Sequence, residues 1–140
     1  MGKMIFVNLP VKDLARSQAF YEALGFTNNP QFTDDTAACM VWSEAIYVML
    51  LTHQRWADFT TRPIPPATSS EVMLAISVDD TDEVNRITDA AGANGGTADV
   101  NPKQDHGFMF SRSFTDPDGH IWEPHWMDPA VADGGEMPGA

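Results

Sequence analysis

Two residues near the end of the chain have side chains that could carry out acid–base chemistry together. Glu123 and His125 stand two positions apart in residues 120–127, a stretch with the composition of a β-strand. Alternate side chains of a strand point to the same face, so we expect both groups on one face. They could form a carboxylate–imidazole pair or supply two metal ligands. The alternative is a buried glutamate satisfied by a neighbour, with His125 in a packing role.

Four further side chains could recognise a ligand. His106 and Arg112 share one strand parity, and Arg112 could clamp a carboxylate or phosphate or pair with surface acids. Tyr47 and Trp122 could line a site, although the hydrophobic core is their default position. Asp116 to Gly119 has the composition of a tight turn, because proline presets φ and glycine permits a positive φ.

The elements that would position these residues occur twice. Val11 to Gly25 and Val78 to Gly92 each run from a strand end through a helical stretch to a glycine, at a constant offset of 67 positions. The same apolar alternation precedes both valines. A strand, a turn and a helix have therefore been duplicated, and the offset predicts which residues correspond in the two copies.

Local signals bound both helices. Asp13 is placed to cap the first helix and Gly25 to end it, while Asp80 to Glu83 offers a capping pattern for the second, which Gly92 is expected to close. The buried stripes are expected at Leu14, Ser17, Phe20 or Tyr21, and Leu24 in the first helix, and at Val84, Ile87 and Ala91 in the second.

Three short strands are predicted after each helix, at 27–32, 37–43 and 46–53, and then at 97–100, 108–115 and 120–127. The chain is therefore predicted to be an α+β protein of two βαβββ modules, at about 4–53 and 72–127. A proline-rich linker, 54–71, joins them and could lie over the site as a lid. Residues 1–128 are expected to form one domain, and 129–140 a flexible tail.

Composition excludes several classes of function. Eight Lys and Arg against 20 Asp and Glu give a formal charge of -12, which repels phosphate backbones and anionic membranes, so no nucleic-acid or membrane partner is expected. No apolar stretch approaches membrane-spanning length, and no signal-peptide pattern precedes the first strand. A cytoplasmic location is expected. The single Cys39 lies in an apolar run typical of a buried structural thiol.

Two motifs resemble a known family. The opening stretch from Phe6 to Phe26 and the closing stretch from Phe114 to Glu123 resemble the vicinal oxygen chelate superfamily, which includes glyoxalase I, bleomycin-resistance proteins and dioxygenases. His106-Gly107-Phe108 is similar to a glyoxalase-like subgroup of mostly uncharacterised bacterial proteins. The resemblance extends over about residues 5–127. It implies paired βαβββ modules that curl their sheets into a shared cradle, and it implies a homodimer.

The same resemblance indicates four positions at which superfamily enzymes hold a divalent cation. In this chain they are occupied by Phe6, Met49, Met73 and Glu123. Phenylalanine cannot coordinate a cation, and a thioether is a poor ligand for a hard or borderline ion. Glu123 is the only retained ligand, so no metal and no other cofactor is expected. The prediction fails if other residues, such as His53, His106 or His125, have taken over.

Three functions remain open from the sequence. The first is a metal-independent protein that binds a small molecule in an apolar cradle. The second is a glyoxalase-, isomerase- or dioxygenase-type enzyme with a non-standard site built on Glu123 and His125. The third is an interaction module that uses the paired sheets as a dimer surface. The predicted ligand-binding residues are Phe6, Asn8, Tyr47, Met49, Met73, His106, Arg112 and Trp122.

Overall fold

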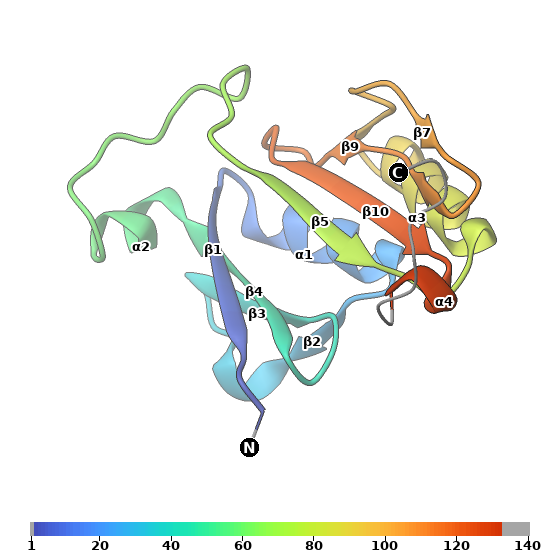
Figure 1. The fold of residues 1–140 in the computed structure, drawn as a ribbon. Helices are drawn as coiled ribbons and strands as arrows, with labels where there is room; N and C mark the ends of the chain where they lie inside the picture. Colours follow the sequence, from blue (N-terminus) through green and yellow to red (C-terminus); the bar gives the residue numbers. More distant parts are fainter. Residues whose placement is uncertain (1, 133–140) are drawn as a thin grey trace.

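Two β-sheets with two long helices packed between them form the body of the molecule (Figure 1). This computed structural model describes residues 2–132. The helices are α1 (Leu14–Leu24), α2 (His53–Ala57), α3 (Thr81–Ala93) and α4 (Pro129–Ala132), with a 3-10 turn η1 (Pro30–Phe32). The strands are β1 (Ile5–Val11), β2 (Thr27–Asn29), β3 (Ala37–Val41), β4 (Ile46–Thr52), β5 (Met73–Ser77), β6 (Thr97–Ala98), β7 (Gln104–Asp105), β8 (Met109–Ser111), β9 (Phe114–Thr115) and β10 (Ile121–Met127).

Each module contributes one sheet, and the two sheets share a plan. In sheet A the strand order is β1-β4-β3-β2, with β1 parallel to β4. In sheet B, β5 lies parallel along one side of β10, while β8 and β9 follow each other antiparallel along its other side. The duplicated βαβββ arrangement predicted from the sequence is therefore confirmed. The register is duplicated too. Asn8 of β1 is in register with Met49 of β4, and Ala75, the counterpart of Asn8 in β5, is in register with Glu123 of β10.

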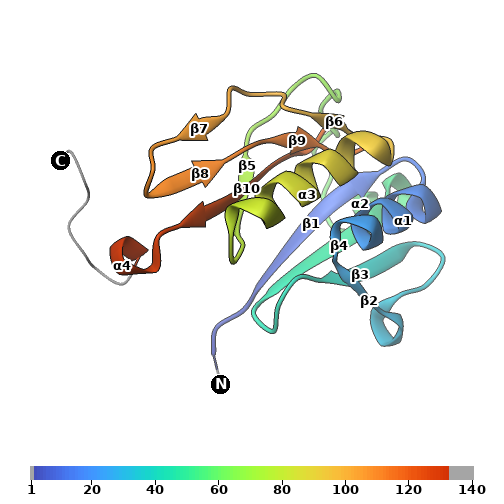
Figure 2. The same cartoon turned by 90° about the vertical axis from the view of Figure 1, so that its right-hand side faces the viewer.

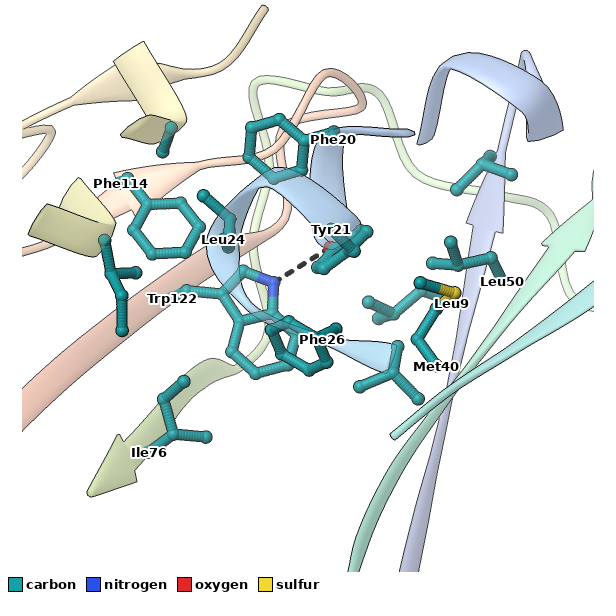
Figure 3. Packing of buried hydrophobic residues seen from close by; sticks show 14 of the residues in the cluster. Leu9, Phe20, Tyr21, Leu24, Phe26, Met40, Leu50, Ile76, Phe114 and Trp122 are labelled. Atoms are coloured by element: carbon teal, nitrogen blue, oxygen red, sulfur yellow. Dashed lines mark hydrogen bonds between the residues drawn. The ribbon is translucent and has the colours of Figure 1, made fainter. Parts of the chain in front are cut away.

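The hydrophobic core lies between the sheets. Helix α1 packs on β3 and β4 of sheet A and on α3, while α3 packs on sheet B. Figure 3 shows α1 in the middle, with Trp122 and Ile76 reaching it from one sheet and Leu9 and Leu50 from the other. The inner faces of the two sheets thus point toward each other and are covered. Their outward faces point in opposite directions, with sheet B at the top and sheet A at the bottom of Figure 2.

The helix boundaries follow the predicted caps, with one correction. The Asp13 carboxylate accepts the Arg16 N–H at the start of α1, and Gly25 ends that helix in the left-handed region. The Asp80 carboxylate accepts the Glu83 N–H at the start of α3. Gly92 does not end α3, however. This helix continues to Ala93, and the left-handed glycine comes later, at Gly95.

Several other boundaries differ from the prediction. The linker begins with helix α2, because the Thr52 hydroxyl accepts the Arg55 N–H and caps it. The strand expected over 108–115 is divided into β8 and β9, and an unpredicted strand, β7, pairs with β8. The predicted tail begins with α4, and its remainder, like residue 1, lies outside the described residues.

Candidate functional site

The outward face of sheet B carries the predicted acid–base residues. Inward-facing Trp122 is buried, so its strand neighbours Glu123 and, two positions on, His125 point outward, and both are half-buried. Their neighbours across the sheet are small. Ala75 is in register with Glu123, and His125 is in register with a serine on each side, Ser77 and Ser111. Within residues 2–132, neither Glu123 nor His125 makes a side-chain hydrogen bond or ion pair.

The outward face of sheet A is aromatic and apolar. Phe6 and Tyr47 are register partners whose rings stack, with centroids 4.6 Å apart and planes 11° from parallel. Asn8 and Met49 form the next row. Phe6 is 50% exposed, an unusual state for so large an apolar side chain. This face offers a flat aromatic surface with one amide beside it.

One chain does not bring these two faces together. The core and α1 separate sheet A from sheet B, so Phe6 and Glu123 lie on opposite outer surfaces of the molecule. Met73, on the sheet B face, is 58% exposed for the same reason. The cradle expected between the two modules of one chain is therefore not formed within that chain. Two separate outward faces are present instead, which we call the A face (Phe6, Asn8, Tyr47, Met49) and the B face (Met73, Ala75, Ser77, Ser111, Glu123, His125).

Arg112 and Trp122 lie on the inner side of sheet B, away from the B face. The Arg112 guanidinium donates to both oxygens of Asp99, at 2.9 and 2.8 Å, and contacts Asp89 at 3.0 Å. Hydrogen bonding to Asp99 raises the pKa of Arg112, and the same bonds lower the pKa of Asp99. A surface hollow of about 660 Å³ adjoins Arg112, but these acids already occupy its guanidinium. The structure thus shows the acid pairing that the sequence left as an alternative.

His106 lies away from both faces as well. It follows β7 in the turn that leads to β8, where it is exposed and its Nε2 lies 3.2 Å from the Gln104 side-chain oxygen. The expected common strand parity of His106 and Arg112 does not exist, since β8 begins only at Met109.

The Asp116 turn connects the two modules through buried hydrogen bonds. The Tyr21 hydroxyl of α1 donates to the Asp116 carboxylate at 2.6 Å and accepts the Trp122 indole N–H at 3.0 Å. Asp116 is 3% exposed, and this burial raises its pKa, although His120 and the Tyr21 hydrogen bond oppose the shift. Burial, followed by the charge of Asp116, also raises the pKa of Tyr21. These groups are bonded to one another and hold the modules in place.

Comparison with known proteins agrees with this architecture. The family model of the glyoxalase/bleomycin resistance protein/dioxygenase superfamily matches residues 3–123. The chain belongs to this superfamily. No curated protein matched it by sequence.

Solved structures of superfamily type share the fold. A hypothetical protein from S. aureus has a TM-score of 0.74 at 26% identity, over 90% of this chain and 95% of that one. A glyoxalase-related enzyme from Fulvimarina pelagi has a TM-score of 0.73 at 21% identity, over 90% and 88%. A fosfomycin resistance protein from Mesorhizobium loti has a TM-score of 0.67 at 18% identity, over 96% and 99%. At these identities the last two similarities establish the fold alone.

The divalent metal of the superfamily enzymes does not fit the residues present. The duplicated register makes Met49 the structural counterpart of Glu123, and Phe6 and Met73 stand at corresponding ends of β1 and β5. A benzyl group, two thioethers and one carboxylate cannot supply the oxygen and nitrogen ligands that such an ion requires. Among residues 2–132, moreover, no three His, Cys, Asp or Glu side chains gather in one place.

Sequence reasoning missed the small residues around the acid–base pair. Ala75, Ser77 and Ser111 are the small register neighbours of Glu123 and His125. The parity of Ser111 was visible in the sequence, but its position opposite His125 depends on the strand register. That register is a tertiary property.

Proposed function

We propose that this superfamily member binds a small molecule between two copies of itself, without a divalent metal. The observation that carries the proposal is the separation of the A face from the B face within one chain. Each face by itself is an open surface that buries little of a ligand, whereas known small-molecule sites enclose most of theirs. Placing the A face of one copy opposite the B face of another completes the site.

The free sheet edges support this assembly. Among the described residues, β1 pairs only with β4 and β5 pairs only with β10, so each strand has an open edge. Exposed apolar side chains occur at the beginning of each strand: Met4, Ile5 and Phe6 at β1, and Val72 and Met73 at β5. Open apolar edges invite pairing with another chain. Pairing β1 with the β5 of a second copy is reciprocal, so it closes as a two-fold dimer with two equivalent sites.

An enzymatic function is the second candidate, and one observation favours it. The carboxylate of Glu123 and the imidazole of His125 share the B face without side-chain partners among the described residues, which leaves both available for proton transfer to or from a ligand. Glu123→Gln should then abolish any turnover found for this protein. Unchanged turnover in that variant would remove Glu123 as the base.

The regions outside the faces add two observations. Within residues 2–132 no helix is long and apolar enough to span a bilayer. The charge of -12 agrees with a partner other than nucleic acid or an anionic membrane. A cytoplasmic location stays part of the proposal.

Light scattering and a neutral fluorescent probe, N-phenyl-1-naphthylamine, test the proposal together. The wild type should have twice the chain mass of 15.4 kDa and should bind the probe saturably. Phe6→Glu places a charge on the apolar edge, so it should give a monomer and abolish probe binding. The matched control is Phe32→Glu, which changes another exposed phenylalanine next to β2, at the opposite edge of sheet A. A monomeric wild type, or equal effects of the two variants, would contradict the proposal.

A further inference from the structure

The sheets of this protein carry almost no charge. The eight Lys and Arg residues all lie outside the ten strands. Arg112, between β8 and β9, points to the inner side and is held by Asp99 and Asp89. Arg55, in α2, contacts Asp58 and lies over the Phe59 ring. The A face and the B face therefore carry no Lys or Arg side chain that could neutralise a phosphate, sulfonate or carboxylate.

Glu123 is the exception among the residues of the two faces. Its carboxylate is half-buried, and no cation accompanies it within the described part of the chain. Transferring an unpaired carboxylate further out of water, as closure of the site by a second copy requires, is costly. A positive group on the ligand would remove this cost. The B face thus carries the negative charge of Glu123 before a ligand binds.

The A face complements a cation as well. The stacked rings of Phe6 and Tyr47 present an aromatic surface, and aromatic faces attract organic cations. Met49 on the A face and Met73 on the B face each add a polarizable thioether to the site proposed between two copies. At long range the net charge of -12 concentrates cations around the protein and repels anions.

We infer that the ligand is an organic cation, a protonated amine or quaternary ammonium group attached to a flat apolar body. The inference rests on the proposed function, since it places the apolar body on the A face of one copy. The cationic group then lies against Glu123 of the other copy. Substrates recognised through a phosphate, phosphonate or carboxylate are disfavoured, because neither face offers them a Lys or Arg side chain.

Three indoles of similar size test the charge of the ligand directly. Tryptamine is cationic, 3-propylindole is neutral and indole-3-propionate is anionic. Calorimetric titration at pH 8 measures the affinity of the protein for each of the three indoles. We expect tryptamine to bind about tenfold more tightly than 3-propylindole, and indole-3-propionate to bind most weakly.

Two variants locate the effect. Glu123→Gln should weaken tryptamine about tenfold and leave 3-propylindole unchanged, because only the cation interacts with the carboxylate. Glu22→Gln makes the same change at an exposed position of α1 and should alter neither affinity. Equal affinity for the cationic and neutral indoles, or preference for the anion, overturns the inference while the proposed function stands. Failure of a dimeric wild type to bind any of the three overturns both, and a Glu22→Gln effect as large as that of Glu123→Gln overturns the role of Glu123.

Discussion

Individual side chains of this protein fall into two groups, those that are fully bonded and those that have no partner. Tyr21, Asp116 and Trp122 belong to the first group, since each satisfies another inside the core. Glu123 belongs to the second within residues 2–132, on the outward side of the same strand as Trp122. Adjacent positions of β10 therefore separate a side chain bonded within the core from one available to a ligand, because alternate residues of a strand face different environments.

Removal of the Tyr21 hydroxyl should destabilise the fold substantially. Tyr21→Phe leaves the Asp116 carboxylate and the Trp122 indole N–H buried with one partner fewer each, which should cost about 2–3 kcal/mol of unfolding free energy. Tyr47→Phe is the matched control, since its hydroxyl donates to the Glu44 carbonyl at an exposed site and should cost less than about 1 kcal/mol. Urea denaturation at pH 7 measures both. Equal losses would contradict the buried network.

The buried Asp116 carboxylate should also give the stability a distinct pH dependence. Its folded pKa is raised above the ordinary value of 3.8, mainly by burial, so the folded state binds this proton more tightly than the unfolded state. Stability from this group is present below pH 3.8 and is lost as pH rises through the raised folded pKa. The unfolding free energy of the wild type minus that of Asp116→Asn should therefore fall as pH rises from 3.8. A difference that grows with pH would contradict the assignment.

Turns and caps explain how the elements are held in place. The Asp116 to Gly119 turn is closed by the Gly119 N–H donating to the Asp116 carbonyl, and it also contacts the neighbouring module. The Lys12 N–H donates to the Asp118 carboxylate at the start of α1, and the His120 ring lies 2.8 Å from the Pro10 carbonyl. A turn motif that is local in sequence thus connects elements more than 100 positions apart.

Gly119 should be intolerant of a side chain for two separable reasons. Its φ is +90°, and a Cβ there would overlap the backbone of Ala67 in the linker. Gly119→Ala should therefore cost about 3 kcal/mol. Gly107→Ala isolates the conformational contribution, because Gly107 has φ +78° with open space around it, and should cost about 1 kcal/mol. Thermal denaturation compares the two, and equal losses would mean that the linker does not pack against the turn.

At the scale of the whole molecule, the position of the helices decides which way the sheet faces point. They fill the space between the two sheets, which gives the chain one continuous core and turns the A face and the B face outward. The core cluster therefore contains none of the side chains of the A face or the B face.

Assembly should consequently appear as concentration dependence of the melting temperature. Dimer formation stabilises the folded chain by mass action, so tenfold dilution of the wild type should lower the melting temperature by a few degrees. Phe6→Glu should melt at the same temperature at both concentrations. Scanning calorimetry provides the measurement, and a wild-type melting temperature that does not change on dilution would contradict the dimer.

The sequence by itself determined the duplicated βαβββ plan, the caps at Asp13 and Asp80 and the turn at Asp116. These features follow from local residue preferences and from the offset of 67, which need no long-range information. The helical linker start and the later end of α3 were missed, because a Thr52 cap and a tolerated glycine are weak local signals.

Only the tertiary structure decided which candidate residues can act together. Met49 and Glu123 occupy equivalent rows of two sheets and Phe6 lies in the row beside Met49, so the repeat predicted that Phe6 and Glu123 share a cradle. The packing of α1 between the sheets placed them on opposite surfaces instead. Arg112 likewise carries a guanidinium that could bind a ligand. Its side chain lies on the inner side of sheet B, however, where it donates to Asp99. Strand alternation can be read from a sequence, but the direction in which a face points depends on what packs against its reverse side.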